Sequence, residues 1–305
     1  MQEITINRLA TRTWNRLGVN EVKLEWDNEN EKPLETTDFT AKRGECPAPL
    51  RIDVKDDGDG YSSKLMNIAA GADSAVTLFE TVTAKSKLYT KLSLKIENGA
   101  KVRVVQLLYP DGGILRHEIS AECGEKSEFD LLTIIMGSGD CYADNTVELR
   151  GDKSVFSADF GYLGRNSQTI DMNLTVNQYG KETESKITAS GALLDAAKKV
   201  FRGTIDFKKG SAGSVGSENE TVLLLGDDVS NKTVPIILCA EENVDGSHGA
   251  TIGELDDATL FYFESRGIER AEAERVMARA AIERPARLSG DEEFEKLVLG
   301  LLGEE

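Results

Sequence analysis

The pattern of apolar and polar positions is most regular in the middle of the chain. From about residue 61 to 250, short runs alternate apolar and polar residues, and Gly, Asp and Asn separate the runs. A period of two turns one face of each run inward, which is typical of half-buried β-strands. The clearest runs lie at 92–96, 102–106, 147–149, 155–160, 170–176, 187–189, 200–207, 222–225 and 234–239. The middle of the chain is therefore predicted to be all-β.

A strand–turn–strand unit recurs loosely within this region, at 96–102, 149–155 and 207–212. Each turn contains a glycine, which tolerates a positive φ and lets the chain turn a tight corner. Many short strands with a weak repeat favour a parallel β-helix, whose coils bury one another's faces. A β-sandwich or a jelly roll predicts the same local pattern, so periodicity alone leaves these folds open.

The two ends of the chain differ from this core. The N-terminal part is mixed, and we expect a short helix around Ile6 to Leu17 followed by polar turns. From about residue 256 the pattern becomes helical. We therefore divide the chain into an N-terminal segment of short helix plus strands (1–60), a β-helix core (61–255) and a small C-terminal α-helical domain (256–305).

The C-terminal part carries helix start and stop signals. The pair Asp256–Asp257 suits the N-terminus of a helix that runs to about Ser265, because carboxylates accept from free backbone N–H groups there and complement the helix dipole. Gly267 is placed to end this helix in the left-handed conformation.

A second helix is predicted for 269–282 and is expected to end at Pro285, and a last amphipathic stretch covers 292–302. The predicted apolar face of the second helix consists of Ala273, Val276, Met277 and Ala280. Helices this short need a surface to dock on. We expect them to cover the open end of the β-helix and protect its edge from further pairing.

The charge balance excludes one class of partner. The 305 residues include 36 basic and 53 acidic side chains, which gives a formal net charge of −17. Such an excess repels phosphate backbones and anionic lipids, so we expect binding to neither nucleic acid nor membrane. No apolar stretch approaches the length needed to cross a bilayer.

The cysteines and the first residues bear on the compartment. Residues 1–5 contain neither a basic leader nor an apolar signal region, so we expect no secretory signal. Cys46, Cys123, Cys141 and Cys239 are scattered, without a C-x-x-C pair. This spacing argues against a zinc ribbon or a disulfide framework, and we expect a cytoplasmic protein with reduced thiols.

The run 245–268 is the most diagnostic stretch. It reads Ser-His-Gly-Ala-Thr-x-Gly at 247–253, an acidic helix start, Leu-Phe-Tyr at 260–262 and Ser-Arg-Gly at 265–267. This run resembles the C-terminal signature of the SufB/SufD family of the SUF iron–sulfur cluster assembly system. Segments at 201–205 and 223–227 look like family segments, and 6–20 looks like the opening of the shorter members.

The resemblance implies a right-handed parallel β-helix followed by a small helical domain. In the family, two such subunits pair through their β-helices, and each docks its C-terminal helices onto a SufC-type ABC ATPase. A transient iron–sulfur cluster or iron then lies at the subunit interface, and we expect the isolated chain to hold none tightly. The residues expected to dock the ATPase are Leu260, Phe261, Tyr262, Ser265, Arg266 and Gly267. For Leu260, Phe261 and Tyr262, a role as core anchors is the alternative.

Two departures from the SufB-like pattern make the chain resemble SufD. Val229 occupies the place of the SufB scaffold cysteine, and Gly249 the place of a glutamate after the signature histidine. Valine cannot ligate iron, and thiolates are the usual anchors of iron–sulfur clusters. The resemblance thus implies a non-catalytic partner of a SufB-type subunit. A homodimeric scaffold that works with SufC alone is the alternative, and the missing cysteine counts against it.

His248 is the residue expected to carry chemistry. The family places a functional histidine in this setting, and a neutral imidazole suits Fe(II), so His248 is a candidate iron or cluster ligand. The structural alternative is a histidine that hydrogen-bonds a turn and packs the end of the β-helix.

The other polar candidates carry less weight. Cys239 is either a substitute ligand or, as its apolar neighbours favour, a small residue inside a buried strand. His117 is predicted to lie on the surface of a strand. The glycine-rich run 210–216 lacks the Lys-Ser/Thr ending of a phosphate loop and is interpreted as a β-corner.

A polysaccharide lyase is the alternative from another functional class, since such enzymes are also β-helical. Lyases of this kind are usually exported and line a groove with basic and acidic catalytic residues. The absence of a signal sequence and the net charge of −17 both disfavour this alternative.

Overall fold

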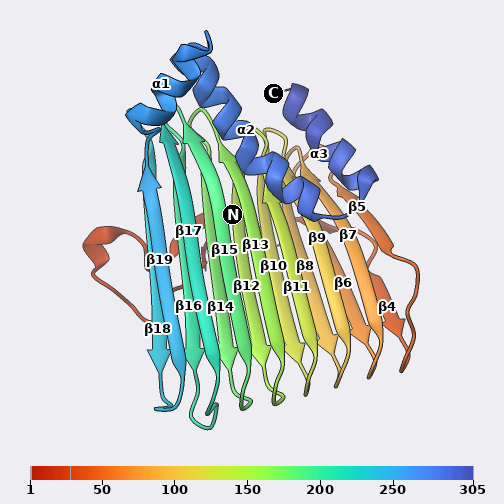
Figure 1. Cartoon of the computed structure of the whole chain (residues 1–305). Helices are drawn as coiled ribbons and strands as arrows, with labels where there is room; N and C mark the ends of the chain where they lie inside the picture. The colour runs from red at the N-terminus through yellow and green to blue at the C-terminus, as the bar shows by residue number, and fades with distance from the viewer. Residues whose placement is uncertain (1, 28, 305) are drawn as a thin grey trace.

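Two parallel β-sheets face each other along a solenoid, and the chain passes from one sheet to the other at each turn (Figure 1). The structure is a computed structural model that describes residues 2–27 and 29–304. The first sheet contains β3 (Glu31–Pro33), β4 (Thr37–Ala41), β6 (Tyr61–Ala70), β8 (Lys87–Ile96), β10 (Ile114–Cys123), β12 (Asp140–Leu149), β14 (Thr169–Gln178), β16 (Lys198–Phe207) and β18 (Ser230–Cys239). The second sheet contains β5 (Leu50–Lys55), β7 (Ala75–Ala84), β9 (Lys101–Pro110), β11 (Glu128–Ile135), β13 (Val155–Gly164), β15 (Glu184–Leu194), β17 (Val215–Leu225) and β19 (Asp245–Gly253). The prediction of a parallel β-helix is confirmed.

Successive coils stack in register, so inward side chains form columns along the solenoid. Leu88, Leu115 and Cys141, for example, occupy paired positions on three neighbouring strands, and all are fully buried. Each residue of such a column is covered by the coils before and after it. A fully buried leucine contributes about 2 kcal/mol through the area removed from water.

The predicted turns are confirmed. Glycine is needed in some of them for its positive φ and in others because a side chain would not fit. Gly99 adopts a φ of +69° in the turn after β8. In the turn after β12 the left-handed residue is instead Lys153, with a φ of +60°. Gly151 lies in the same turn and is needed for space, because a Cβ atom there would overlap the backbone of Glu125 in the preceding coil.

The predicted helix from Ile6 to Leu17 is wrong. The segment begins with β1 (Gln2–Ile6), which pairs antiparallel with β2 (Val22–Trp26), and only Asn15–Leu17 forms a 3-10 turn. The reason is tertiary: Asn7 has a φ of +49°, and its Nδ2 donates to the Asp171 side chain at 2.5 Å. A residue held in this conformation against the first sheet cannot continue a helix.

The helix signals near residue 256 are confirmed. In α1 (Asp257–Ser265), the backbone N–H of Thr259 donates to the Asp256 side chain at 2.7 Å. Gly267 follows the helix with a φ of +77°, and its N–H donates to the Glu264 carbonyl at 2.9 Å. Both signals act within a few residues, which is why the sequence shows them.

The prediction that Pro285 ends the second helix is wrong, since α2 runs from Arg270 to Leu288 with the proline inside it. The proline lacks an N–H for the Ala281 carbonyl, but its ring packs on Gly161 of β13, where a Cβ atom would overlap it. The predicted apolar face is also shifted, because Val276 and Ala280 are exposed. The buried residues of α2 are Ala273, Ala278, Ile282, Pro285 and Ala286.

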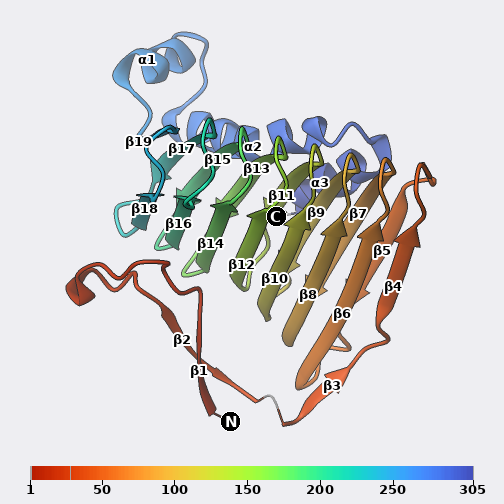
Figure 2. The same cartoon turned by 90° about the horizontal axis from the view of Figure 1, so that it is seen from below.

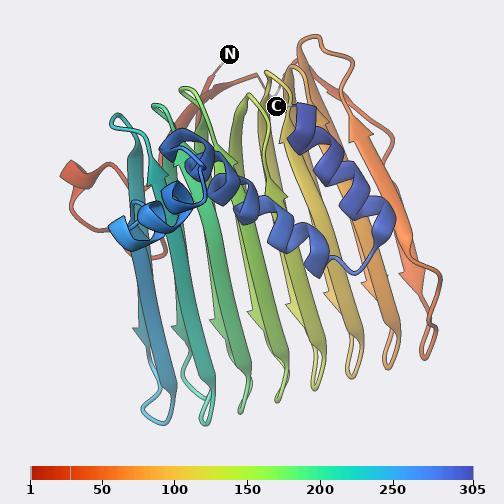
Figure 3. The ribbon, with the colours of Figure 1, turned by 45° about the horizontal axis from the view of Figure 1, so that its top comes forward.

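The helices lie along the side of the solenoid and do not cover its end. α2 and α3 (Glu292–Glu304) cross the outer face of the second sheet (Figure 3). Ile282 of α2 and Val298 of α3 join residues such as Leu107 and Ile134 in one apolar cluster. The expectation that they close the open end is therefore wrong, and β19 stays exposed along nearly its whole length. No helix in the described ranges is long and apolar enough to cross a membrane.

Gly161→Ala should displace α2, because the added methyl group meets the ring of Pro285. We expect the free energy of unfolding, measured by urea denaturation, to fall by about 1–3 kcal/mol. Gly300→Ala is the matched control: it lies in α3 with open space around it, and it should be neutral or stabilising by up to about 1 kcal/mol. Equal stability of the two variants would show that the contact between Gly161 and Pro285 does not hold the helix.

Candidate functional site

His248 lies at the open end of the solenoid, on the last strand. It pairs with Glu218 of β17, whose inward positions alternate with exposed ones. His248 therefore takes an inward position of the last coil. Within residues 2–27 and 29–304 no coil follows β18 and β19 (Figure 2). The inward position of His248 is therefore exposed to solvent.

A buried polar cluster lies one coil below this end. Lys199 Nζ is 2.5 Å from Glu220 Oε1, and both side chains are fully buried. Tyr162 Oη donates to the same carboxylate at 2.8 Å, and Thr233 Oγ1 on the last coil donates to it at 2.5 Å. These hydrogen bonds satisfy the buried ion pair, and loss of either charged partner would leave an uncompensated charge in the core.

Glu218 is the carboxyl group nearest to His248 in register, and it is only 2% exposed. Within the described part of the chain, no hydrogen bond to its carboxylate is found. Burial, assisted by the charge of Glu220, raises the pKa of Glu218 to about 7, against the opposing effect of Lys199. Gly203 provides the space, since a Cβ atom there would overlap the Glu218 carboxyl group. An acid that changes charge near neutral pH thus lies beneath the histidine.

Neither of the two positions that differ from the SufB-like pattern shares the inward face of β19 with His248. Val229 is in the turn before β18, where its partly buried side chain packs against the main core. Gly249 follows His248 on β19 and so faces the opposite, outer side of the second sheet, next to Asn219. Gly249 is thus next to the histidine in sequence but on the other face of the strand, and Val229 lies outside this strand.

Cys239 is exposed at the end of β18, so its predicted place inside a buried strand is wrong. β18 is the edge of the first sheet, and no further coil covers it. Ile237 lies across from Gly246, so Cys239 and His248 are on facing sheets and are offset by four positions, or about 13 Å, along the strand direction. Among residues 2–27 and 29–304, no group of three or more His, Cys, Asp or Glu side chains could hold a metal ion.

His117 is fully buried, so its predicted surface position is also wrong. Its Nδ1 lies 2.7 Å from Thr90 Oγ1 of the neighbouring coil, and burial lowers its pKa to about 3. The signal was available in the run 115–119, where the histidine alternates in phase with Leu115 and Ile119. The position of His117 in the alternation of the strand therefore decided its burial, and the polarity of its side chain did not.

A second buried polar column escaped sequence analysis. Glu80, Gln106 and Thr133 occupy paired inward positions of the second sheet, and all are fully buried. Their side chains have no hydrogen-bond partners within the described residues. Burial raises the pKa of Glu80 to about 8, so the side chain is uncharged at neutral pH. Its phase with Leu78 and Val82 was the signal that could have identified it.

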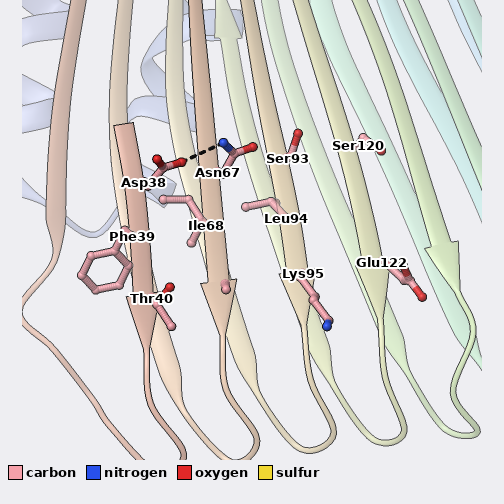
Figure 4. A pocket seen from close by; sticks show the side chains of 11 residues that line it. Asp38, Phe39, Thr40, Asn67, Ile68, Ser93, Leu94, Lys95, Ser120 and Glu122 are labelled. Carbon is pink, nitrogen blue, oxygen red and sulfur yellow. Dashed lines mark hydrogen bonds between the residues drawn. The ribbon is translucent and has the colours of Figure 1, made fainter. Parts of the chain in front are cut away.

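The hollows on the surface lie away from these groups. One of about 520 Å³ lies over the outer face of the first sheet, where Asn67 Nδ2 donates to Asp38 at 2.8 Å (Figure 4). It is lined mainly by short polar side chains, with Lys95 and Glu122 on neighbouring strands. None of the predicted site residues lines it.

The residues expected to dock a partner divide into buried and exposed ones. Leu260 packs with Leu255 and Ala273 and is a core anchor. Phe261 and Tyr262 are 71% and 56% exposed on α1. The end of α1 forms a small ordered surface: the Arg266 guanidinium lies 5.2 Å above the Tyr262 ring, Ser265 Oγ donates to the Tyr262 carbonyl, and Gly267 follows.

Comparison with known proteins adds a family match. The family model described as "SUF system FeS cluster assembly, SufBD core domain" matches residues 54–281. The chain is 30% identical to the iron-sulfur cluster assembly protein SufD of Bacillus subtilis over 154 residues, which is 50% of this chain and 35% of that protein.

Two further relatives extend the comparison. The chloroplastic SufBD family protein ABCI8 of Arabidopsis thaliana is 26% identical over 257 residues, 78% of this chain and 46% of the relative. SufD of Escherichia coli is 23% identical over 172 residues, 56% of this chain and 41% of the relative. The chain thus spans between about a third and a half of the length of these curated relatives.

The buried titratable groups make stability depend on pH. The pKa of Glu80 is raised from 4.5 to about 8, so between these values the unfolded chain has lost a proton that the folded chain keeps, and stability falls as pH rises. The pKa of His117 is lowered from 6.5 to about 3, so stability falls as pH drops through that window.

Glu80→Gln should remove the loss on the alkaline side. We expect its free energy of unfolding to exceed that of the wild type by on the order of 2–4 kcal/mol at pH 8, and the difference to shrink towards pH 4.5, in urea titrations at several pH values. Glu128→Gln, on the exposed end of β11, should leave the pH profile unchanged. Parallel profiles for Glu80→Gln and the wild type would mean that Glu80 is not held protonated.

Proposed function

The chain belongs to the SufBD core family of the SUF system for FeS cluster assembly, and from this premise we propose that it is a non-catalytic, SufD-like scaffold subunit. The observation that carries the proposal is the exposure of His248, the histidine of the family signature, at an uncovered solenoid end. The match to this family also accounts for the β-helical fold, which was the reason to consider a polysaccharide lyase.

The open end is the surface through which we expect the chain to pair with a second SufBD-type solenoid. β18 and β19 are edge strands with unpaired backbone groups, and such edges readily accept another strand. Besides His248, the inward positions of these strands include four apolar residues, Pro235, Ile237, Ala250 and Ile252. A SufB-type subunit is the proposed partner, and a second copy of this chain is the alternative.

The proposed chemistry at this interface is transient binding of iron or of a nascent iron–sulfur cluster, which is the cargo of the system. A neutral imidazole at His248 suits Fe(II) as a ligand. Val229 provides no thiolate, so the partner subunit would supply the sulfur ligands. Glu218 could hold or release a proton beneath the histidine as the charge of the cargo changes. The isolated chain is not expected to hold a cluster tightly.

We further propose that α1 docks a SufC-type ABC ATPase in a reducing, cytoplasmic setting. Phe261 and Tyr262 offer aromatic surface, and Arg266 stacks on the tyrosine, a combination typical of binding hot spots. Leu260 supports them from inside through its contact with α2. Movement of the ATPase would then reach the solenoid through the packing of α2 on the second sheet.

His248→Ala should lower cluster loading without preventing assembly of the complex. After anaerobic coexpression with SufB-type and SufC-type partners, we expect iron and sulfide per complex to fall severalfold, because an imidazole ligand is lost. Ser247→Ala, on the outer side of the same strand, is the matched control. Unchanged iron and sulfide in the His248→Ala complex would remove the ligand assignment.

Substitutions in α1 should separate docking from folding. Phe261→Ser and Tyr262→Ser should reduce copurification of the ATPase while leaving the urea midpoint unchanged, because both side chains are exposed. Leu260→Ala should lower the free energy of unfolding by about 2 kcal/mol, since it removes a buried anchor. Glu264→Ala, exposed on the same helix, serves as control, and full ATPase recovery with both serine variants would argue against docking through α1.

A further inference from the structure

We infer that the turn around Trp14 is a contact surface for a second copy of this chain, bound end to end at β18 and β19. The inference rests on the proposed pairing of solenoids through that end. It adds a contact outside the two edge strands, made by the segment between β1 and β2. The partner feature it recognises is an acidic turn beside the edge strand.

The turn is rigidly built although its tip is exposed. The Leu17 N–H donates to the Trp14 carbonyl at 3.0 Å, and Gly18 ends the turn with a φ of +62°. The Asn20 side chain accepts from the Thr13 N–H at 2.7 Å and donates to the Thr13 carbonyl at 3.0 Å. Trp14 is nevertheless 81% exposed. A tryptophan presented on a preorganised turn loses little conformational entropy on binding, and tryptophan is enriched in binding hot spots.

The base of the turn is fastened to the outer face of the first sheet. Arg202 is fully buried in an ion pair with Asp171, and its Nε donates to the Val19 carbonyl at 2.5 Å. Lys232 of β18 donates to the Leu17 carbonyl at 2.9 Å. The turn is therefore tied to the last coil itself, and the segment between β1 and β2 projects past the edge of the solenoid there (Figures 1 and 2).

The charge of the turn is opposite to that of the chain as a whole. Residues 7–20 contain Arg8, Arg12 and Arg16 and no acidic residue, in a chain of net charge −17. Arg8 and Arg12 lie 3.9 Å and 3.6 Å from Glu21. Arg16 is exposed near the tip, beside Trp14. The turn thus offers an aromatic and basic surface next to an edge that needs a partner.

A second copy carries the complementary charge at the same end. The turns on the two sides of β18 contain Asp227 and Asp228 before it, and Glu241 and Glu242 after it. Edge strands related by a twofold axis run antiparallel, so the Trp14 turn of one copy would lie along the last coil of the other, which carries an acidic turn at each end of β18. Two acidic ends would otherwise repel each other. The arginine-bearing turn offsets this repulsion and gives the pair a salt-sensitive contact.

The test is self-association of the purified full chain, measured by sedimentation velocity over a dilution series at low and high salt. Trp14→Ala and Arg16→Glu should each raise the dimer Kd by at least about tenfold, and high salt should reduce the effect of Arg16→Glu. Both side chains are exposed, so the urea midpoints should not change. Arg43→Glu, exposed on the first coil at the far end of the solenoid, is the control for net charge.

A charge swap makes the test specific. Arg16→Glu chains are mixed either with chains carrying Asp227→Lys and Asp228→Lys or with chains carrying Glu241→Lys and Glu242→Lys. Association should be restored by the pair of lysines that replaces the acidic turn in contact with Arg16. Unchanged affinity of both Trp14→Ala and Arg16→Glu would overturn the inference. In that case an Ile252→Asp variant, which places a charge at an inward position of β19, distinguishes the causes: if it abolishes dimers, the proposed pairing stands without the turn.

The experiment also distinguishes a chain that does not pair with itself from a chain that does not pair at all. If the wild-type chain stays monomeric but pairs with a SufB-type subunit on coexpression, the present inference is overturned and the proposed function survives. If it pairs with neither, both are overturned.

Discussion

The in-register stacking of parallel coils is the constraint on which the rest of this molecule depends. Each inward side chain rests on the side chains at the same position of the coils before and after it. Apolar columns such as Leu88, Leu115 and Cys141 follow directly, because each member removes its neighbours from water. The constraint also creates the exposed end, since the last coil has the same inward positions but no further coil in the described part of the chain covers them.

The same stacking gives polar inward residues their properties. Glu80 and His117 lie in columns that exclude water, so burial keeps both in their neutral forms near neutral pH. Near the open end, Lys199 and Glu220 keep opposite charges in contact. Glu218 lies between this pair and His248, at the boundary between the closed interior and solvent. The chemistry proposed for the chain therefore lies where the column of stacked residues ends.

The outer faces of the two sheets serve different purposes. The second sheet carries α2 and α3, and the close contact of Pro285 with Gly161 fixes how α2 lies on it. The first sheet carries the N-terminal segment, held by the buried pair of Arg202 and Asp171. Both additions leave β18 and β19 open. The edge strands β18 and β19 thus remain available to pair with another strand.

The sequence by itself determined the features whose causes are local. Alternation in runs such as 170–176 identified strands, the helix start at Asp256 and the stop at Gly267 act within a few residues, and the family signature singled out His248. Only the tertiary structure decided burial and contact between coils. It put Asn7 against Asp171 in place of a helix, buried His117, exposed Cys239 and let α2 continue through Pro285. The physical reason is that these outcomes depend on what the neighbouring coil or helix presents, and that neighbour is far away along the chain: Thr90 is 27 residues from His117, and Asp171 is 164 residues from Asn7.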